Sequence, residues 1–202
     1  MKSSKALIFI FINMGIFVLA SFFINTICFY LSPIALFVIL FYSYTKRFTY
    51  LCHIVLGVGL SLAPIGAYLA VTGSFALLPL LFSLAVIFWV SGFDIIYALQ
   101  DEEFDVHNEL HSIPALLGKK RALMVSRFLH FIAAALVLFA GFYGDFGMFY
   151  IIGALGFCGM LFYQQSIVKA NDLSRVNIAF MTANGIASVL FSIFVIIDLF
   201  IK

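Results

Sequence analysis

The sequence has 202 residues, of which 65% are hydrophobic and only 10% charged, and its mean hydropathy is +1.19. A soluble domain is about half apolar and about a quarter charged, so this composition excludes an ordinary water-soluble protein. Lipid is the solvent that suits such a chain. We therefore expect an all-α, polytopic membrane bundle that forms a single membrane domain over residues 1–202.

Seven apolar stretches are long enough to cross a bilayer as helices, since a span needs about 20 mostly apolar residues. They run over residues 6–24, 26–43, 51–72, 75–98, 122–141, 146–166 and 178–200. The first two stretches nearly touch, so a tight turn near Asn25 and Thr26 must separate them, and one longer helix is the alternative. The first stretch has no recognisable small-residue cleavage site, so we expect it to remain in the mature protein.

The basic residues give these seven helices an orientation. With seven spans, ten of the eleven Lys and Arg residues fall on one side of the membrane, and only Lys202 falls on the other. Because cytoplasmic loops carry the excess of Lys and Arg, the N-terminus is expected inside the cell and the C-terminus outside. The net charge is only +2 and no basic patch suits nucleic acid, so no nucleic-acid partner is expected.

Six of the nine acidic residues lie between Asp94 and Glu109, on the side expected to be cytoplasmic. Asp94 follows a long apolar run, so it lies near a helix end, where an ionisable group needs a partner or a wet cavity. If that helix continues, Asp94, Asp101 and Asp105 share one face with Tyr97, because the steps are three or four residues. Mg²⁺ prefers such oxygen ligands together with substrate phosphates. The spacing favours a Mg²⁺–phosphate site, and a solvated charged loop is the simpler alternative.

The histidines and cysteines give weaker signals. His107 and His111 stand at helical spacing, but no third nitrogen or sulfur ligand lies near them, which disfavours zinc. His53 and His130 lie in apolar runs and are interpreted as hydrogen-bonded structural residues. The three cysteines match no metal or redox spacing and are interpreted as core residues.

The acidic stretch also carries a motif. Residues 94–123 are DIIYALQDEEFDVHNELHSIPALLGKKRAL, with an Asp, a Tyr-Ala pair, two spaced Asp residues, a Ser, and a Gly before a basic helix start. This string closely resembles the second aspartate-rich motif of the UbiA superfamily of intramembrane prenyltransferases. Residues 42–57 (YSYTKRFTYLCHIVLG) and 63–73 (APIGAYLAVTG) resemble the region ahead of that motif, so the resemblance extends over nearly the whole chain. The LHSIP string at 110–114 is similar to the 4-hydroxybenzoate polyprenyltransferase branch, including members thought to use 1,4-dihydroxy-6-naphthoate.

The chain departs from the family pattern in three places. Phe104 replaces an acidic residue that is common in ubiquinone-pathway members, and Glu109 stands where Gly is frequent. The family has nine transmembrane helices with a first aspartate-rich motif on the second, but no counterpart of that motif precedes Lys46 here. The resemblance therefore implies a partial prenyltransferase that corresponds to helices three to nine, begun at an internal methionine or truncated.

The resemblance also implies a chemistry. In this family a polyprenyl diphosphate is held through Mg²⁺, diphosphate departs, and an electron-rich aromatic acid attacks the allylic cation, as a step of ubiquinone or menaquinone biosynthesis. Asp94, Asp101 and Asp105 would hold metal and diphosphate, and Tyr97 would stabilise the cation. The substrate-binding residues would be Lys46, Arg47, His111 and Ser112. For Lys46 and Arg47 the alternative is that they only anchor the helices at the cytoplasmic side. The implied location is the bacterial inner membrane, with the lipid tail between helices.

Other interpretations stay open. Because the first motif is absent from the 202 residues, the isolated chain is expected to show no turnover. A non-catalytic remnant or a lipid-binding membrane scaffold would have the same composition. A small transporter is a weaker alternative, since the chain has no paired, interrupted halves.

Overall fold

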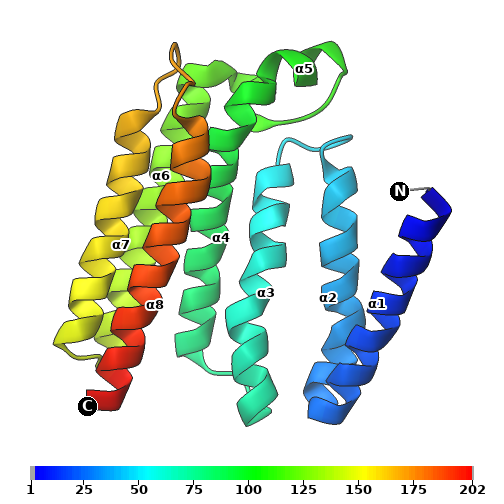
Figure 1. Cartoon of the computed structure of the whole chain (residues 1–202), viewed down its shortest axis with the longest axis vertical. Coiled ribbons are helices and arrows are strands. Elements are labelled where there is room, and N and C mark those ends of the chain that lie inside the picture. The colour runs from blue at the N-terminus through cyan, green and yellow to red at the C-terminus, as the bar shows by residue number, and fades with distance from the viewer. Residues whose placement is uncertain (1–2, 202) are drawn as a thin grey trace.

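The computed structural model of the chain describes residues 3–201, which form helices arranged side by side (Figure 1). The elements are α1 (Ser3–Ile24), α2 (Thr26–Thr45), α3 (Cys52–Thr72), α4 (Leu77–Ala98), the 3₁₀ turn η1 (Leu99–Asp101), α5 (Glu102–His107), α6 (Ile113–Tyr143), α7 (Met148–Ile167), the π-helical segment η2 (Ile178–Ala183) and α8 (Asn184–Ile201). Within residues 3–201, seven helices are long and apolar enough to cross a membrane. The predicted all-α class and the seven spans are confirmed, and the chain is an integral membrane protein.

The boundary between α1 and α2 is the single residue Asn25, which confirms the predicted turn and excludes one longer helix. Asn25 has an extended backbone (φ −167°, ψ 168°), and its side-chain oxygen accepts a hydrogen bond from the Cys28 N–H at 2.9 Å. Asn suits this position because its side chain satisfies an N–H that the first helical turn leaves free. The Asn25 amide also donates to the Leu69 carbonyl at 2.8 Å, which ties the turn to α3.

Each long helix packs mainly against its neighbours in the sequence, with α4 and α6 at the centre. α4 contacts both α3 and α6, and α7 pairs with α8, whereas α1 packs on α2 and leaves most of its apolar surface exposed. One buried cluster includes Ile95, Leu99, Ile113 and Val176. It joins the end of α4, the start of α6 and the α7–α8 connection, and so it supports the segment that carries the acidic residues.

One end of the bundle gathers the α2–α3 loop, the α4–α6 segment with α5, and the α7–α8 connection (Figure 1). These segments and the adjoining helix ends carry Lys46, Arg47, Lys119, Lys120, Arg121, Lys169 and Arg175. The acidic segment 101–109 lies at this same end, which we call the polar end. Lys2 and Lys202 lie outside the described residues, and Lys5 lies in the first turn of α1.

α6 begins at Ile113, well before the predicted span 122–141. Ser112 caps its first turn and Pro114 occupies it, where the fixed φ of proline suits a helix and its missing N–H is not needed. The helix is kinked at Gly118, where φ is 74° and ψ is 160°, a backbone that favours glycine. The prediction missed this part because charged residues and a glycine interrupt the apolar run.

At the opposite end, α8 supplies a cap for α7. Asp198 is 3% exposed, and its carboxylate accepts hydrogen bonds from the backbone N–H groups of Gly147 (2.6 Å) and Tyr150 (3.2 Å). N–H groups at a helix start have no partner in their own helix, and a helix N-terminus favours negative charge. These contacts satisfy a buried carboxylate and fix the end of α8 against α7.

Candidate functional site

The helix that carries Asp94 does not continue through the acidic segment. α4 ends at Ala98, a 3₁₀ turn covers Leu99–Asp101, and the six-residue α5 follows in a different direction (Figure 1). The condition for one shared helical face from Asp94 to Asp105, an uninterrupted helix, is therefore not met. The backbone is still helical at Leu99 (φ −59°, ψ −26°) and leaves the helical conformation at Asp101 (φ −97°, ψ 1°), where α5 takes a new direction.

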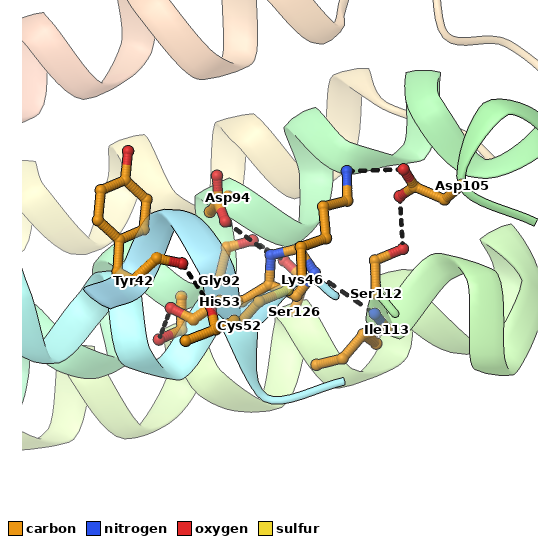
Figure 2. A network of polar contacts seen from close by, with 12 residues as sticks. Tyr42, Lys46, Cys52, His53, Gly92, Asp94, Asp105, Ser112, Ile113 and Ser126 are labelled. Atoms are coloured by element: carbon orange, nitrogen blue, oxygen red, sulfur yellow. Dashed lines mark hydrogen bonds and ion pairs between the residues drawn. The ribbon is translucent and has the colours of Figure 1, made fainter. Parts of the chain in front are cut away.

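Asp94 lies in the last turn of α4 and is held by His53 from the first turn of α3 (Figure 2). His53 Nδ1 lies 2.6 Å from Asp94 Oδ2, and the Ile113 N–H donates to His53 Nε2 over 3.4 Å. A neutral imidazole with its proton on Nδ1 makes both bonds. The side chains of His53 and Asp94 are 3% and 21% exposed, so a buried ring fixes a partly exposed carboxylate. The other Asp94 oxygen has no hydrogen-bond partner within residues 3–201.

Asp105 forms a second polar contact, between Lys46 and Ser112 (Figure 2). Its carboxylate is fully buried, with Oδ1 2.7 Å from the Lys46 ammonium, and Oδ2 accepts a hydrogen bond from the Ser112 hydroxyl at 2.8 Å. The Ser112 oxygen in turn accepts from the Ala115 N–H at 3.3 Å as the cap of α6. Asp105 thereby links the residue after α2 to the start of α6.

The backbone joins the same two loops. The His111 N–H donates to the Lys46 carbonyl at 2.6 Å, and the His111 ring meets Tyr50 edge-on with 4.7 Å between ring centroids. The Cys52 thiol donates to the His111 carbonyl at 3.5 Å. The α2–α3 loop and the α4–α6 segment therefore form one connected polar unit.

Three residues of the predicted site lie outside these contacts. Asp101 is half-buried, and within residues 3–201 its side chain has no hydrogen bond or ion pair. Tyr97 is 39% exposed, and its ring centroid lies 4.4 Å from that of Phe180 in η2. Arg47 is exposed, with its guanidinium 5.5 Å from the centre of the Tyr44 ring.

The predicted aspartates do not form a complete metal-binding site by themselves. Among residues 3–201, no three His, Cys, Asp or Glu side chains are grouped to hold a metal ion by themselves. Mg²⁺, however, commonly takes one or two carboxylates and completes its shell with water or substrate phosphates. Asp94 and Asp101 offer such oxygens, whereas Asp105 is engaged by Lys46 and Ser112. The residues present therefore fit Mg²⁺ in donor type, with a ligand supplying the remaining oxygens.

An apolar cavity of about 980 Å³ lies among the helices, and no carboxylate lines it within residues 3–201. Residues of α1, α2, α3, α4 and α8 line it, and they include Phe93, the residue directly before Asp94. Its few polar lining residues include Ser32 and Asn184. The cavity is large and apolar enough to accommodate an extended apolar group.

Two residues of the candidate site and its cavity were not predicted from the sequence. His53, interpreted as a structural residue, is hydrogen-bonded as expected, but its partner is Asp94, 41 positions away on another helix. Asn184 was not singled out, although its side-chain oxygen accepts from the Trp89 indole N–H at 3.1 Å and from the Gln164 amide. The available signal for both was a polar side chain within an apolar run.

A comparison with known families finds a match to the UbiA prenyltransferase family over residues 1–186. The chain belongs to this family. The resemblance recognised in the acidic motif and in the stretch ahead of it is therefore confirmed.

Curated relatives of this UbiA-family chain include two proteins named 4-hydroxybenzoate octaprenyltransferase. The protein from Francisella tularensis subsp. mediasiatica (strain FSC147) is 29% identical over 175 residues, which cover 86% of this chain and 61% of the relative. That from Shewanella pealeana (strain ATCC 700345 / ANG-SQ1) is 28% identical over 191 residues, which cover 94% and 66%. The chain thus spans less than two thirds of the length of these relatives.

Two solved structures share the arrangement of helices. The apo structure of a UbiA homolog from Aeropyrum pernix K1 matches with a TM-score of 0.89 and 29% identity, over 98% of this chain and 74% of that chain. A structure of digeranylgeranylglyceryl phosphate synthase in membranes matches with a TM-score of 0.77 and 18% identity, over 98% and 70%, which shows the fold alone. The described helices have the UbiA fold.

Proposed function

We propose that this UbiA-family chain takes part in the transfer of a polyprenyl group from polyprenyl diphosphate to a small aromatic acid in quinone biosynthesis. The name shared by its curated relatives supports 4-hydroxybenzoate as the acceptor, and a dihydroxynaphthoate is the second candidate. Because the chain spans 61–66% of those relatives, the proposal concerns what its own residues can bind and orient.

The observation that supports the proposal is the position of Asp94 directly after Phe93, a residue that lines the apolar cavity. One Asp94 oxygen has no hydrogen-bond partner within residues 3–201, and the adjacent Phe93 lines the cavity of about 980 Å³. A polyprenyl diphosphate has the same division into a charged head and an apolar tail. The head would lie at Asp94 and Asp101, and the tail would enter the cavity sideways from the bilayer.

Mg²⁺ is the cofactor that suits this head group. Asp94 and Asp101 would hold it together with diphosphate oxygens, in keeping with the preference of Mg²⁺ for few carboxylates and for substrate phosphates. When bound, the ion neutralises charge that develops on the departing diphosphate. Asp105 stays a proposed third ligand, which requires Lys46 and Ser112 to release its carboxylate.

The chain's own residues would orient the head group. His53 holds the Asp94 carboxylate through its 2.6 Å hydrogen bond, so the free oxygen keeps a fixed direction. Lys46 and Arg47 supply positive charge at the same polar end. A cation near the bridging oxygens would favour departure of diphosphate electrostatically.

Aromatic rings would shield the allylic cation. Tyr97 packs on Phe180, which also meets Phe93 with 5.5 Å between ring centroids. Such rings stabilise a cation through their faces and exclude water that would quench it. Ser112 and His111, in the connected polar unit, are the proposed contacts to the aromatic acid.

The test measures binding of geranylgeranyl diphosphate to the purified chain in detergent micelles, with and without MgCl₂. Binding should depend on Mg²⁺, and Asp101→Asn should weaken it by about tenfold or more, since even indirect metal partners typically cost that much. Glu109→Gln is the matched control, because it removes one negative charge from an exposed residue at the same end. Equal weakening by both variants would contradict a specific site.

Turnover is measured in parallel with 4-hydroxybenzoate as acceptor. The isolated chain should release no prenylated product, because the family resemblance assigns further metal ligands to a first aspartate motif that these 202 residues lack. Robust prenylation would overturn this expectation while leaving the site intact. Absence of Mg²⁺-dependent binding would instead favour a non-catalytic, lipid-binding scaffold.

The bacterial inner membrane is the proposed location, with the N-terminus and the acidic segment in the cytoplasm and the C-terminus outside. The bacterial relatives and the cations at the polar end support it. A reporter enzyme that works only outside the cytoplasm should be active at the C-terminus and inactive when inserted after Arg47. The reverse pattern would exclude this orientation.

A further inference from the structure

A second hollow lies between α6 and α7, away from the acidic segment. Its volume is about 510 Å³. The α6 side contributes four residues spaced as one helical face, and the α7 side contributes five with the same periodicity. The lining residues are Arg127, His130, Phe131, Ala134, Cys158, Leu161, Phe162, Gln165 and Ser166. We call this hollow the α6–α7 groove.

The α6–α7 groove opens toward the bilayer. Phe131 and Phe162, one from each helix, are 71% and 77% exposed. The Gln165 amide closes the floor, because it donates to the Ser126 hydroxyl at 2.8 Å and lies 3.0 Å from His130 Nδ1. These bonds join the two helices, while His130 Nε2 and Gln165 Oε1 are buried without a hydrogen-bond partner within residues 3–201. Phe131, Ala134, Leu161 and Phe162 supply the apolar lining beside lipid.

Arg127 is the one charged residue that lines the groove. Gln165 bonds to Ser126, and α7 ends at Ile167, so Arg127 lies close to the cytoplasmic-side end of α7, at the polar end. Its side chain is exposed, and among residues 3–201 no carboxylate forms an ion pair with it. An unpaired cation at this end of a lipid-facing helix attracts anionic lipid headgroups.

We propose that the α6–α7 groove binds an anionic phospholipid. Its phosphate would lie on the Arg127 guanidinium, whose planar fork suits phosphate oxygens. One acyl chain would run between Phe131 and Phe162, along a face that extends over about 10 Å from Arg127 to Ala134. Charge complementarity selects this occupant, because the groove pairs an apolar channel with a single cation at the lipid–water boundary.

The test uses the full purified chain and counts retained lipid by native mass spectrometry after exchange into detergent containing defined phospholipid. Phosphatidylglycerol should be retained at least about fivefold better than phosphatidylcholine, as one interfacial cation contributes about 1 kcal/mol. Arg127→Gln should remove that preference, and Arg127→Lys should keep part of it. Arg121→Gln is the matched control, since Arg121 is an exposed arginine of the same helix that does not line the groove.

Two further arms identify the source of the phosphate and the role of the channel. Inorganic phosphate should not displace phosphatidylglycerol, because it offers no acyl chain. Cys158→Phe fills the groove and should lower retention of both lipids, and it tests the channel independently if the Arg127 variants fail to fold.

Four results would overturn the proposal. The first is equal retention of the two lipids, and the second is an equal loss of lipid preference in Arg121→Gln and Arg127→Gln. The third is displacement of phosphatidylglycerol by inorganic phosphate. The fourth is a change in oligomeric state of the groove variants without a change in lipid retention. The third result would indicate a free-phosphate site, and the fourth would indicate a second copy of the chain as the occupant.

Discussion

The ion pair between Lys46 and Asp105 gives a quantitative test of how the polar end is held together. Asp105 is 0% exposed and Lys46 is 32% exposed, so the two partners are not equivalent. Lys46→Met leaves a buried carboxylate with only the Ser112 hydroxyl, and removing one partner of a buried pair costs about 3–5 kcal/mol. Asp105→Asn keeps an oxygen for Ser112 and frees an ammonium that can turn to water. Its cost should be about 1.5–3 kcal/mol, near the lower value because water screens Lys46.

Equilibrium unfolding in mixed micelles with increasing SDS measures these losses through the emission of Trp89, the one tryptophan of the chain. The double variant Lys46→Met/Asp105→Asn should lose less than the sum of the single variants, because the second change removes the stranded carboxylate. Lys120→Met is the control, since Lys120 is an exposed lysine at the same end without an ion pair within residues 3–201. If Lys46→Met is no worse than Asp105→Asn, or if the two losses simply add, the reasoning fails.

Three further predictions concern packing within the bundle. Asp198→Ala removes the cap of α7 and should cost about 1–3 kcal/mol in the same unfolding assay. Asp198→Asn should retain part of the capping. Equal losses in the two variants would show that the negative charge, rather than the hydrogen bonds, stabilises the start of α7. Gly57→Ala should destabilise by about 1–3 kcal/mol because its Cβ would lie 2.5 Å from the Ile87 carbonyl oxygen, whereas Gly59→Ala, with nothing within 4 Å, should not. Asn184→Leu strands the Trp89 indole N–H and should both destabilise the chain and shift the Trp89 emission; an unchanged spectrum would contradict that hydrogen bond.

Much of the fold could be predicted because each span must bury apolar side chains in lipid whatever its neighbours do. The turn at Asn25 was also predictable, since a polar capping residue between two apolar runs has a local meaning. The start of α6 was not, because Ser112, Pro114 and the kink at Gly118 act below the length that hydropathy detects. The π-helical turn Ile178–Ala183 escaped for a similar reason, since nothing in its apolar pattern marks a shift of helical register.

The candidate site was located by its motif, but its contacts were not predictable. Spacing arguments assume a continuous helix, and the backbone departs from it at Asp101, before Asp105 is reached. The partner of Asp105 is Lys46, which precedes it by two membrane helices. Such pairings depend on how α3 and α4 pack, and the packing of these helices could not be predicted from one sequence.

The distribution of partners leads to one more prediction, on which aspartate meets an incoming ion. Asp94 is bonded to His53 and Asp105 to Lys46, whereas Asp101 is half-buried without a partner among residues 3–201. An unpaired carboxylate gains most from a cation, so Asp101→Asn should lower Mg²⁺-dependent binding of geranylgeranyl diphosphate more than Asp105→Asn does, while Asp105→Asn should cost more folding stability. Binding isotherms and unfolding curves on the same two proteins separate these effects. If Asp105→Asn removes binding as fully as Asp101→Asn in a chain that is still folded, then Lys46 must release Asp105 when the ion arrives, and the ion pair is an apo-state arrangement rather than a permanent tie.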